Sequence, residues 1–365
     1  MAVKDDVLAA LGKVLSPDGK PLTQTGTLSD IVATDGKVFF SITVDAAAVR
    51  QWEPVRERAE AAVRATPGVA SALVALTGER TSTPSSPASG GGKARGAAPA
   101  GIPGVEAIIA VASGKGGVGK STTAVNLALG LRDLGLKVGI LDADIYGPSM
   151  PKLLAIRERP QTIGGTRLKP ISRHGMAVMS IGFLIEEETP MIWRGPMVMS
   201  ALTQMLREVE WGALDIMVVD MPPGTGDAQL TMAQQVPLKG AVIVSTPQDL
   251  ALIDARRGIA MFRRVNVPVL GIVENMSYFL CPHCGGRSDI FGHGGARAEA
   301  ERLNVPFLGE VPLDIEIREK SDSGLPVVAT APDGPNARIY REIAARVRDG
   351  LPGASRPAPK IVIEA

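Results

Sequence analysis

The residues from Gly114 to Ser121 form a glycine-rich loop whose composition suits the binding of phosphate groups. Their sequence fits the spacing G-x-x-x-x-G-K-[ST], in which the glycines let backbone N–H groups turn toward an anion. In such a loop the ammonium group of Lys120 contacts the β- and γ-phosphates, and the hydroxyl of Ser121 binds Mg²⁺. The predicted nucleotide-binding residues are Gly114, Lys115, Gly116, Gly117, Val118, Gly119, Lys120, Ser121 and Thr122.

The segments on either side of the loop support this interpretation. Residues 107–111 are a short apolar run, as expected for a buried parallel strand that leads into the loop. Apolar residues recur at helical spacing afterwards, which predicts a helix that begins near Thr122. The positive end of that helix dipole would face the same phosphates. A chance match in a flexible Gly-rich segment is the alternative, and the strand and helix argue against it.

Two carboxylates follow the next apolar run, residues 138–141. Asp142 and Asp144 lie just past this predicted strand, in the sequence Asp-Ala-Asp-Ile-Tyr-Gly-Pro-Ser. Carboxylates in this position hold Mg²⁺-bound water or orient the water that attacks the γ-phosphate. Either aspartate could instead cap the N-terminus of a helix. We assign catalytic roles to Lys120, Asp142 and Asp144.

Two further polar residues end predicted strands. Asp220 closes the run 216–219 in the manner of a Walker-B carboxylate, and we assign it to the outer shell of the Mg²⁺ ion. The Pro-Pro-Gly-Thr-Gly segment that follows suits a switch loop that changes shape with the γ-phosphate. Asn275 follows the run 269–273 and is predicted to bind the edge of the base, although asparagine in a loop is often only a turn former.

The only two cysteines of the chain, Cys281 and Cys284, form a C-x-x-C pair. Two thiolates at this spacing can face one metal, and Gly285 allows backbone N–H groups to approach the sulfurs. Four ligands are normally needed, and His283, which lies between the two cysteines, is expected to point away from the metal that they share. A two-fold dimer would supply four thiolates on its axis. A [4Fe–4S] cluster and Zn²⁺ both accept such a site, and a redox disulfide is the third alternative.

The elements that must position these residues alternate along the chain. Apolar runs separated by helical patterns indicate a mostly parallel, doubly wound sheet covered on both faces, with ligands at the carboxyl ends of its strands. The predicted strands are 107–111, 137–141, 177–181, 216–219, 240–244, 269–273 and 307–311. A final helix, about 336–349, has only a narrow apolar stripe. We therefore expect it to pack against the rest of the domain and not to lie on a membrane.

Three other segments complete the organisation. Residues 1–80 read as a small α+β domain with the order αββαβ, whose second and third elements are joined through the turn Asp35-Gly36. Residues 81–105 read as a flexible linker, since 14 of the 24 residues in 81–104 are Pro, Gly or Ser. The P-loop domain is assigned to residues 106–350, and a Pro-rich tail to residues 351–365.

Composition limits the partners and the compartment. The net charge of +1 gives no general attraction to nucleic acid or to an anionic membrane. No apolar stretch approaches the roughly 20 residues that span a bilayer, and the N-terminus lacks the layout of a secretory signal. We therefore predict a cytoplasmic protein without a nucleic-acid or membrane partner.

The P-loop with its second lysine, the Asp142–Asp144 segment and the Asp220 loop together resemble the MinD/ParA/nitrogenase-iron-protein group of P-loop ATPases. This resemblance implies that ATP is the nucleotide and that the protein is a homodimer. It also implies a catalytic role for Lys115, which would reach across the dimer to the nucleotide of the partner subunit.

Adding the cysteine pair and the segment Trp193-Arg194-Gly195-Pro196 narrows the resemblance to the Mrp/ApbC family of iron–sulfur cluster carriers, over residues 106 to 350. The N-terminal domain is similar to the PaaD-like domain of bacterial members, but it contains no cysteine. The resemblance implies an ATPase that binds a [4Fe–4S] cluster through Cys281 and Cys284 and delivers it to apo-proteins, with cluster-assembly factors as further partners. A positioning ATPase in the manner of MinD or ParA, and a zinc-bridged ATPase scaffold, are the alternatives.

Overall fold

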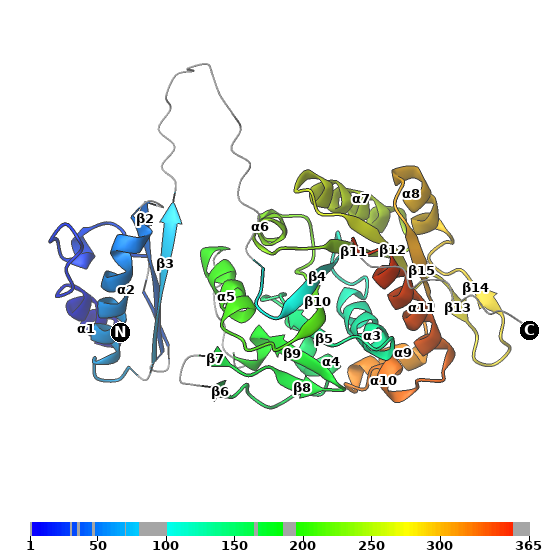
Figure 1. Cartoon of the computed structure of the whole chain (residues 1–365), viewed down its shortest axis with the longest axis horizontal. Helices are drawn as coiled ribbons and strands as arrows, with labels where there is room; N and C mark the ends of the chain where they lie inside the picture. The colour runs from blue at the N-terminus through cyan, green and yellow to red at the C-terminus, as the bar shows by residue number, and fades with distance from the viewer. Residues whose placement is uncertain are drawn as a thin grey trace, which may run out of the picture. The chain divides into compact units, whose positions relative to one another are not determined.

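The structure, a computed structural model, describes residues 2–29, 31–34, 37–45, 48–69, 71–79, 101–163, 167–184 and 195–352 (Figure 1). Contacts within the chain divide it into two compact units, Met1–Arg95 and Gly96–Ala365. Several predictions lie outside the described residues: the turn Asp35-Gly36, the linker up to residue 100, Trp193 and Arg194, and the tail beyond residue 352.

The N-terminal unit is a small α+β domain. Its sheet pairs β1 (Val32–Thr34) antiparallel to β2 (Lys37–Asp45), and β2 lies parallel to β3 (Ser71–Glu79). Helices α1 (Ala2–Leu11) and α2 (Val49–Arg64) pack on this sheet, and a short 3-10 turn, η1 (Leu22–Gln24), follows α1. The helix α2 buries one apolar face, formed by Trp52, Val55, Ala59 and Val63 at helical spacing. The predicted order αββαβ is confirmed.

The second unit is built on an eight-stranded sheet with the order β15-β12-β11-β4-β10-β5-β9-β8. All neighbouring strands are parallel except the edge strand β8, which pairs antiparallel with β9. The strands are β4 (Val105–Ala112), β5 (Val138–Asp142), β8 (Ile171–Arg173), β9 (Met176–Ser180), β10 (Leu214–Asp220), β11 (Gly240–Ser245), β12 (Val269–Asn275) and β15 (Phe307–Val311).

Two small hairpins and a set of helices complete this unit (Figure 1). The hairpins are β6 (Thr162–Ile163) with β7 (Arg167–Leu168), and β13 (Phe279–Leu280) with β14 (Arg287–Ser288). The helices are α3 (Lys120–Asp133), α4 (Met150–Leu153), η2 (Ile181–Phe183), α5 (Gly195–Arg207), α6 (Asp227–Gln235), α7 (Asp249–Arg264), α8 (Gly295–Leu303), α9 (Ile315–Asp322), α10 (Val327–Thr330) and α11 (Pro335–Asp349).

The sheet is covered on both faces, because every residue of β5 and of β11 is buried although their side chains alternate in direction. The mostly parallel, doubly wound sheet predicted from the apolar runs is therefore confirmed. The antiparallel edge strand β8 was not predicted, since its three residues are too few to form a recognisable apolar run.

The last helix, α11, packs into the core of this unit. Its residues Ile343, Ala344 and Val347 are fully buried, and the helix lies against α3. The contact is close at Gly130 of α3, where an added Cβ atom would lie 2.9 Å from the Cβ of Ala344. The apolar stripe of α11 is thus a packing face, as the sequence favoured.

Packing of the second unit begins a few residues before the predicted boundary at residue 106. Ile102 is buried in the core and β4 starts at Val105. Helix α3 likewise begins at Lys120, two residues before its predicted start. The domain boundaries themselves stay a prediction.

Candidate nucleotide and metal sites

The polar residues predicted to act together lie at one edge of the sheet. Strand β4 leads into the glycine-rich loop, and β10 and β5 lie beside it in turn, all parallel. Their register pairs Asp220 directly with Asp142 on the neighbouring strand. Because parallel strands end at the same edge, the loop and both carboxylates meet there.

The glycine-rich loop has the backbone conformation that its composition suggests. Gly117 and Gly119 have φ angles of 79° and 77°, in the left-handed region that favours glycine. Gly119 is the N-cap residue of α3, and its carbonyl accepts a hydrogen bond from the Thr123 hydroxyl at 2.9 Å. The Ser113 hydroxyl donates to the Lys115 carbonyl at 2.8 Å. The loop therefore ends on a helix N-terminus, where an anion is favoured.

A cavity of about 430 Å³ opens beside this loop. Its lining combines the loop with the segment after β5 and with the turn after β10. The lining residues are Ser113, Lys115, Gly116, Gly117, Gly119, Lys120, Ser121, Thr122, Asp144, Pro148, Ser149, Lys152, Leu153 and Pro223. Most predicted nucleotide-binding residues thus share one cavity. Five residues predicted for the nucleotide site lie outside this lining: Gly114, Val118, Asp142, Asp220 and Asn275.

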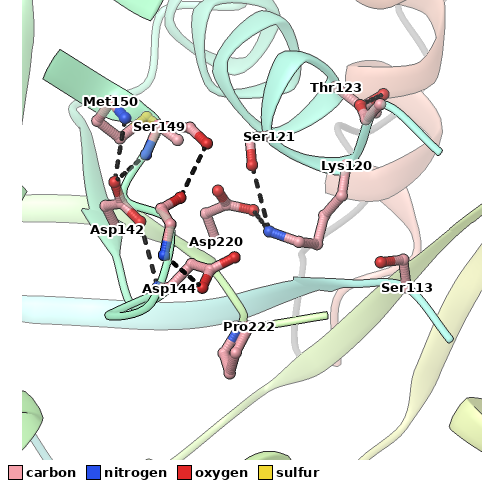
Figure 2. Close-up of polar contacts among 12 residues, drawn as sticks. Ser113, Lys120, Ser121, Thr123, Asp142, Asp144, Ser149, Met150, Asp220 and Pro222 are labelled. Atoms are coloured by element: carbon pink, nitrogen blue, oxygen red, sulfur yellow. Dashed lines mark hydrogen bonds and ion pairs between the residues drawn. The ribbon is translucent and has the colours of Figure 1, made fainter. Parts of the chain in front are cut away.

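Lys120, which lines the cavity, forms a buried ion pair with Asp220 (Figure 2). The Lys120 Nζ atom lies 2.5 Å from Asp220 Oδ1 and 3.2 Å from the Ser121 hydroxyl, to which it also donates. The Asp220 side chain is fully buried. Burial raises the pKa of Asp220, and the charge of Lys120 acts in the opposite direction.

The second carboxylate oxygen of Asp220 is a candidate for contact with Mg²⁺-bound water. Among the described residues, Asp220 Oδ2 is buried and has no hydrogen-bond partner. A buried oxygen without a partner costs free energy, so a ligand that satisfies it is favoured. Carboxylate, hydroxyl and water oxygens are the ligands that Mg²⁺ prefers. The residues present at this site, Ser121 and Asp220, therefore fit the ion.

The structure gives Asp142 and Asp144 different surroundings (Figure 2). Asp142 is fully buried and accepts hydrogen bonds from Ser149 N and Met150 N, at 2.9 and 3.0 Å, and from the Ser180 hydroxyl at 2.9 Å. It therefore anchors the start of α4, close to the capping role that the sequence left open. Asp144 lines the cavity, and burial raises its pKa while Lys120 lowers it. Catalysis by either residue stays a prediction.

Replacing Asp142 with asparagine is expected to flatten the pH dependence of the free energy of unfolding. Burial, together with the charge of Asp220, raises the pKa of Asp142 from 3.8 to about 7. The folded chain then keeps a proton that the unfolded chain loses, so wild type loses up to about 4 kcal/mol of stability as the pH rises from about 4 to about 7. Chemical denaturation at several pH values measures this loss. Parallel curves for the two proteins would contradict the shifted pKa.

Asn275 contacts the glycine-rich loop itself. Its amide nitrogen donates to the Val118 carbonyl at 2.9 Å, and the residue is buried. The loop and the end of β12 are in close contact, because a Cβ atom at Gly119 would lie 2.1 Å from Asn275 Nδ2. Contact between Asn275 and a base stays a prediction, and the structure adds a role in fixing the loop.

The two cysteines lie in the turn of the hairpin β13–β14. Cys281 N donates to the Gly286 carbonyl at 2.9 Å, and Gly285 N donates to the Cys281 carbonyl at 2.8 Å. Cys284 is exposed and Cys281 is half-buried. Hydrogen bonds from the backbone N–H groups of His283 and Cys284 lower the pKa of the Cys281 thiol. The predicted approach of backbone N–H groups to a sulfur is present in this turn.

The surroundings of the cysteine pair limit the metal ligands available within one chain. Within the described ranges, no group of three or more His, Cys, Asp and Glu side chains is arranged to hold a metal ion. His293 hydrogen bonds through Nδ1 with Arg287 at 2.8 Å. Metal binding by Cys281 and Cys284 stays a prediction, and so does the supply of further ligands by a partner subunit.

Several residues that shape the site were missed in the sequence. Ser180, at the end of β9, supports Asp142, and the Gln229 side chain donates to the Pro222 carbonyl and holds the turn after Asp220. Neither Ser180 nor Gln229 belongs to a recognisable sequence motif. Their roles follow only from the strand order, which brings distant segments together.

The described helices include none that combines the length and the apolar composition needed to cross a membrane.

Comparisons with known proteins match both units. A family model described as NUBPL iron-transfer P-loop NTPase matches residues 104–348. A second family model, described as iron-sulfur cluster assembly protein, matches residues 4–74. The first match contains the glycine-rich loop and the cysteine pair, and the second lies within the N-terminal unit.

Individual proteins extend these matches. An iron-sulfur cluster carrier protein of Escherichia coli is 58% identical over 248 residues, which cover 68% of this chain and 67% of that protein. Another, from Synechocystis, is 44% identical over 356 residues, which cover 95% of this chain and 97% of that protein. The solved structure of a nucleotide-binding protein from Archaeoglobus fulgidus in complex with ADP has a TM-score of 0.57 and 40% identity, and the match covers 65% of this chain and 92% of that one.

Proposed function

Because this chain belongs to the NUBPL iron-transfer P-loop NTPase family, we propose that it holds a [4Fe–4S] cluster between two subunits and transfers it to apo-proteins, with binding and hydrolysis of ATP. Relatives that match most of the chain are named iron-sulfur cluster carrier proteins. The family resemblance drawn from the sequence motifs is confirmed. The cluster type, the dimer, the hydrolysis of ATP and the predicted cytoplasmic location belong to this proposal.

The observation that carries the proposal is the pair of thiols in an accessible turn, which no third His, Cys, Asp or Glu side chain of the described residues joins in a group arranged to hold a metal ion. Four thiolates suit a [4Fe–4S] cluster, and each chain offers Cys281 and Cys284. A two-fold axis beside the hairpin would bring two such pairs together. The cluster is the cargo of this site, so exposure of Cys284 also gives a recipient protein access to it.

The residues of the cavity supply binding and orientation for ATP. The backbone N–H groups of the loop and the ammonium group of Lys120 would hold the β- and γ-phosphates. Ser121 and Asp220 would hold Mg²⁺ directly and through water, and the ion neutralises developing charge on the phosphates. Asp144 lines the cavity, where its carboxylate would orient the attacking water. Phosphate binding requires Lys120 to exchange part of its contact with Asp220 for the nucleotide.

Lys115 is proposed to act on the nucleotide of the partner subunit. It lines the cavity and is only half-buried, so its ammonium group is available to a neighbouring molecule. The same contact would make the dimer depend on the nucleotide. The N-terminal unit contains no cysteine, and we propose that it docks recipient proteins or cluster-assembly factors.

Anaerobic reconstitution with iron and sulfide tests the proposal. Wild type should bind roughly four irons per dimer, with the absorption and Mössbauer spectra of a [4Fe–4S] cluster. The double variant Cys281→Ala/Cys284→Ala should bind none, because it lacks every thiolate of the chain. His283→Ala, in the same turn, serves as the matched control and should bind iron as wild type does.

Two other outcomes have distinct meanings. A wild-type protein that forms no cluster but binds zinc tightly would overturn the carrier function in favour of a zinc-bridged scaffold. A protein that binds neither metal and still hydrolyses ATP would point to a positioning ATPase. Transfer of the cluster to an apo-protein, followed by the activity gained by the recipient, completes the test.

A further inference from the structure

One buried carboxylate holds both ends of the segment that carries the cysteines. Glu274 lies near the end of β12 and is fully buried. Its Oε1 accepts a hydrogen bond from the Ser277 hydroxyl at 2.6 Å, where the segment leaves the sheet. Its Oε2 accepts one from Ala296 N at 2.7 Å, in the first turn of α8, where the segment returns. A carboxylate is favoured there, because the helix dipole and the free N–H groups both attract it.

The next residue of β12 contacts the nucleotide loop. The Asn275 amide donates to the Val118 carbonyl, and Gly119 approaches the same amide closely. Successive side chains of a strand point to opposite faces of the sheet. Glu274 therefore contacts the base of the cysteine segment on one face, and Asn275 contacts the phosphate-binding loop on the other.

The base of the hairpin is tied to the sheet as well. Ser277 N donates to the Val311 carbonyl at 3.0 Å, and Leu313 N donates to the Tyr278 carbonyl at 2.7 Å. Beyond this base, the residues from Pro282 to Ile290 are exposed. The contacts at the base therefore set the position of the thiols. Among these contacts, the hydrogen bonds to Glu274 are the ones that a buried side chain makes.

We propose that Glu274 is a positioning residue that, together with Asn275, transmits occupancy of the phosphate-binding loop to the cysteine hairpin. Nucleotide binding reorganises the loop around Val118, and the end of β12 moves with it. Both anchors of the hairpin follow, because they are bonded to the one carboxylate. The biological meaning of this inference rests on the proposed function. The coupling between the phosphate-binding loop and the cysteine hairpin is itself a property of the protein without a bound cluster.

Thiol labelling of the full-length apo-protein tests the link, since the two cysteines are the only ones in the chain and both lie in the hairpin. The rate of alkylation by iodoacetamide is measured with and without saturating Mg-ADP. In wild type the two rates should differ by about fivefold or more, as expected for a coupling between two sites. Ser277→Ala removes one of the two anchors, and it should move the ratio of the rates markedly toward one.

The matched control is Ser245→Ala. Ser245 is also fully buried and ends the neighbouring strand β11, but its hydroxyl donates to the Thr246 carbonyl and not to the hairpin base. This variant should keep the wild-type ratio. Affinity for Mg-ADP, measured by calorimetry, should stay at the wild-type value in both variants, which separates lost coupling from lost binding.

Three outcomes would overturn the link. They are equal rates in wild type with and without Mg-ADP, an unchanged ratio in Ser277→Ala, and an equal loss of the ratio in Ser245→Ala. An unchanged ratio in Ser277→Ala would mean that the nucleotide changes thiol reactivity by a route that bypasses this anchor, such as shielding by a second copy. Glu274→Gln, which keeps one acceptor oxygen and so supports one anchor, provides a second test should Ser277→Ala fold poorly, and it too should move the ratio toward one. None of these assays contains iron, so failure of the link and failure of cluster binding are distinguishable.

Discussion

Replacing Lys120 with alanine is expected to lower the rate of ATP hydrolysis by about 10²- to 10³-fold, the loss typical when one preorganised charge is removed from a transition state. The Lys120 ammonium group lies in the cavity, with Ser121 and Asp220 as its partners. It is the lysine that the loop spacing assigns to the β- and γ-phosphates. Steady-state phosphate release by the purified protein measures the loss.

The same change is also expected to destabilise the fold. Lys120 is the ion-pair partner of Asp220, which is fully buried and paired in register with Asp142. Removing one partner of a buried ion pair costs about 3–5 kcal/mol, because the other charge stays buried without compensation. Chemical denaturation should show this loss at neutral pH, and Asp220 should then take up a proton.

The double variant Lys120→Ala/Asp220→Asn separates the two effects. Without a charge at position 220 the stability should return toward that of wild type, whereas ATP hydrolysis should stay as low as in the single variant. Recovery of hydrolysis in the double variant would contradict the assignment of Lys120 to the phosphates. A single variant as stable as wild type would contradict the ion pair.

The strength of the sequence prediction differed between two kinds of residue. Residues that follow an apolar run were placed at the correct edge, because parallel strands end together whatever their order. Asp220 and Asp142 are examples. That they lie directly opposite each other depends on β10 and β5 being neighbours, and the sequence did not predict that order. The glycine-rich loop was predictable for a similar reason, since its chemistry is contained in consecutive residues.

Residues that act through distant contacts were not predictable from local patterns. Glu274 directly follows the apolar run 269–273 and belongs to no motif, yet it is bonded to Ala296, 22 positions away. Asn275 was predicted to face a base, and its contact with Val118 spans 157 positions. Such pairs depend on which strands are neighbours and on where the loops return, and neither is encoded by spacing along the chain.

Alanine at Gly119 is expected to cost distinctly more stability than alanine at Gly117, although the two glycines have nearly the same φ angle, 77° and 79°. Each change forces a side chain into the left-handed region, at about 1–2 kcal/mol. At Gly117 nothing lies within 4 Å of the added Cβ atom, whereas at Gly119 it would lie 2.1 Å from Asn275 Nδ2. The amide must move and release the Val118 carbonyl, which adds about 1–3 kcal/mol.

The comparison is sharpened by repeating both changes in an Asn275→Ala background. There the hydrogen bond to Val118 is already absent and the space beside Gly119 is open, so the costs of the two alanines should become nearly equal. The difference between the backgrounds is a coupling energy between residues in contact. Equal costs in the wild-type background would show that Asn275 moves aside freely. In that case Asn275 would not hold the phosphate-binding loop, and the end of β12 would have no firm contact through which to sense it.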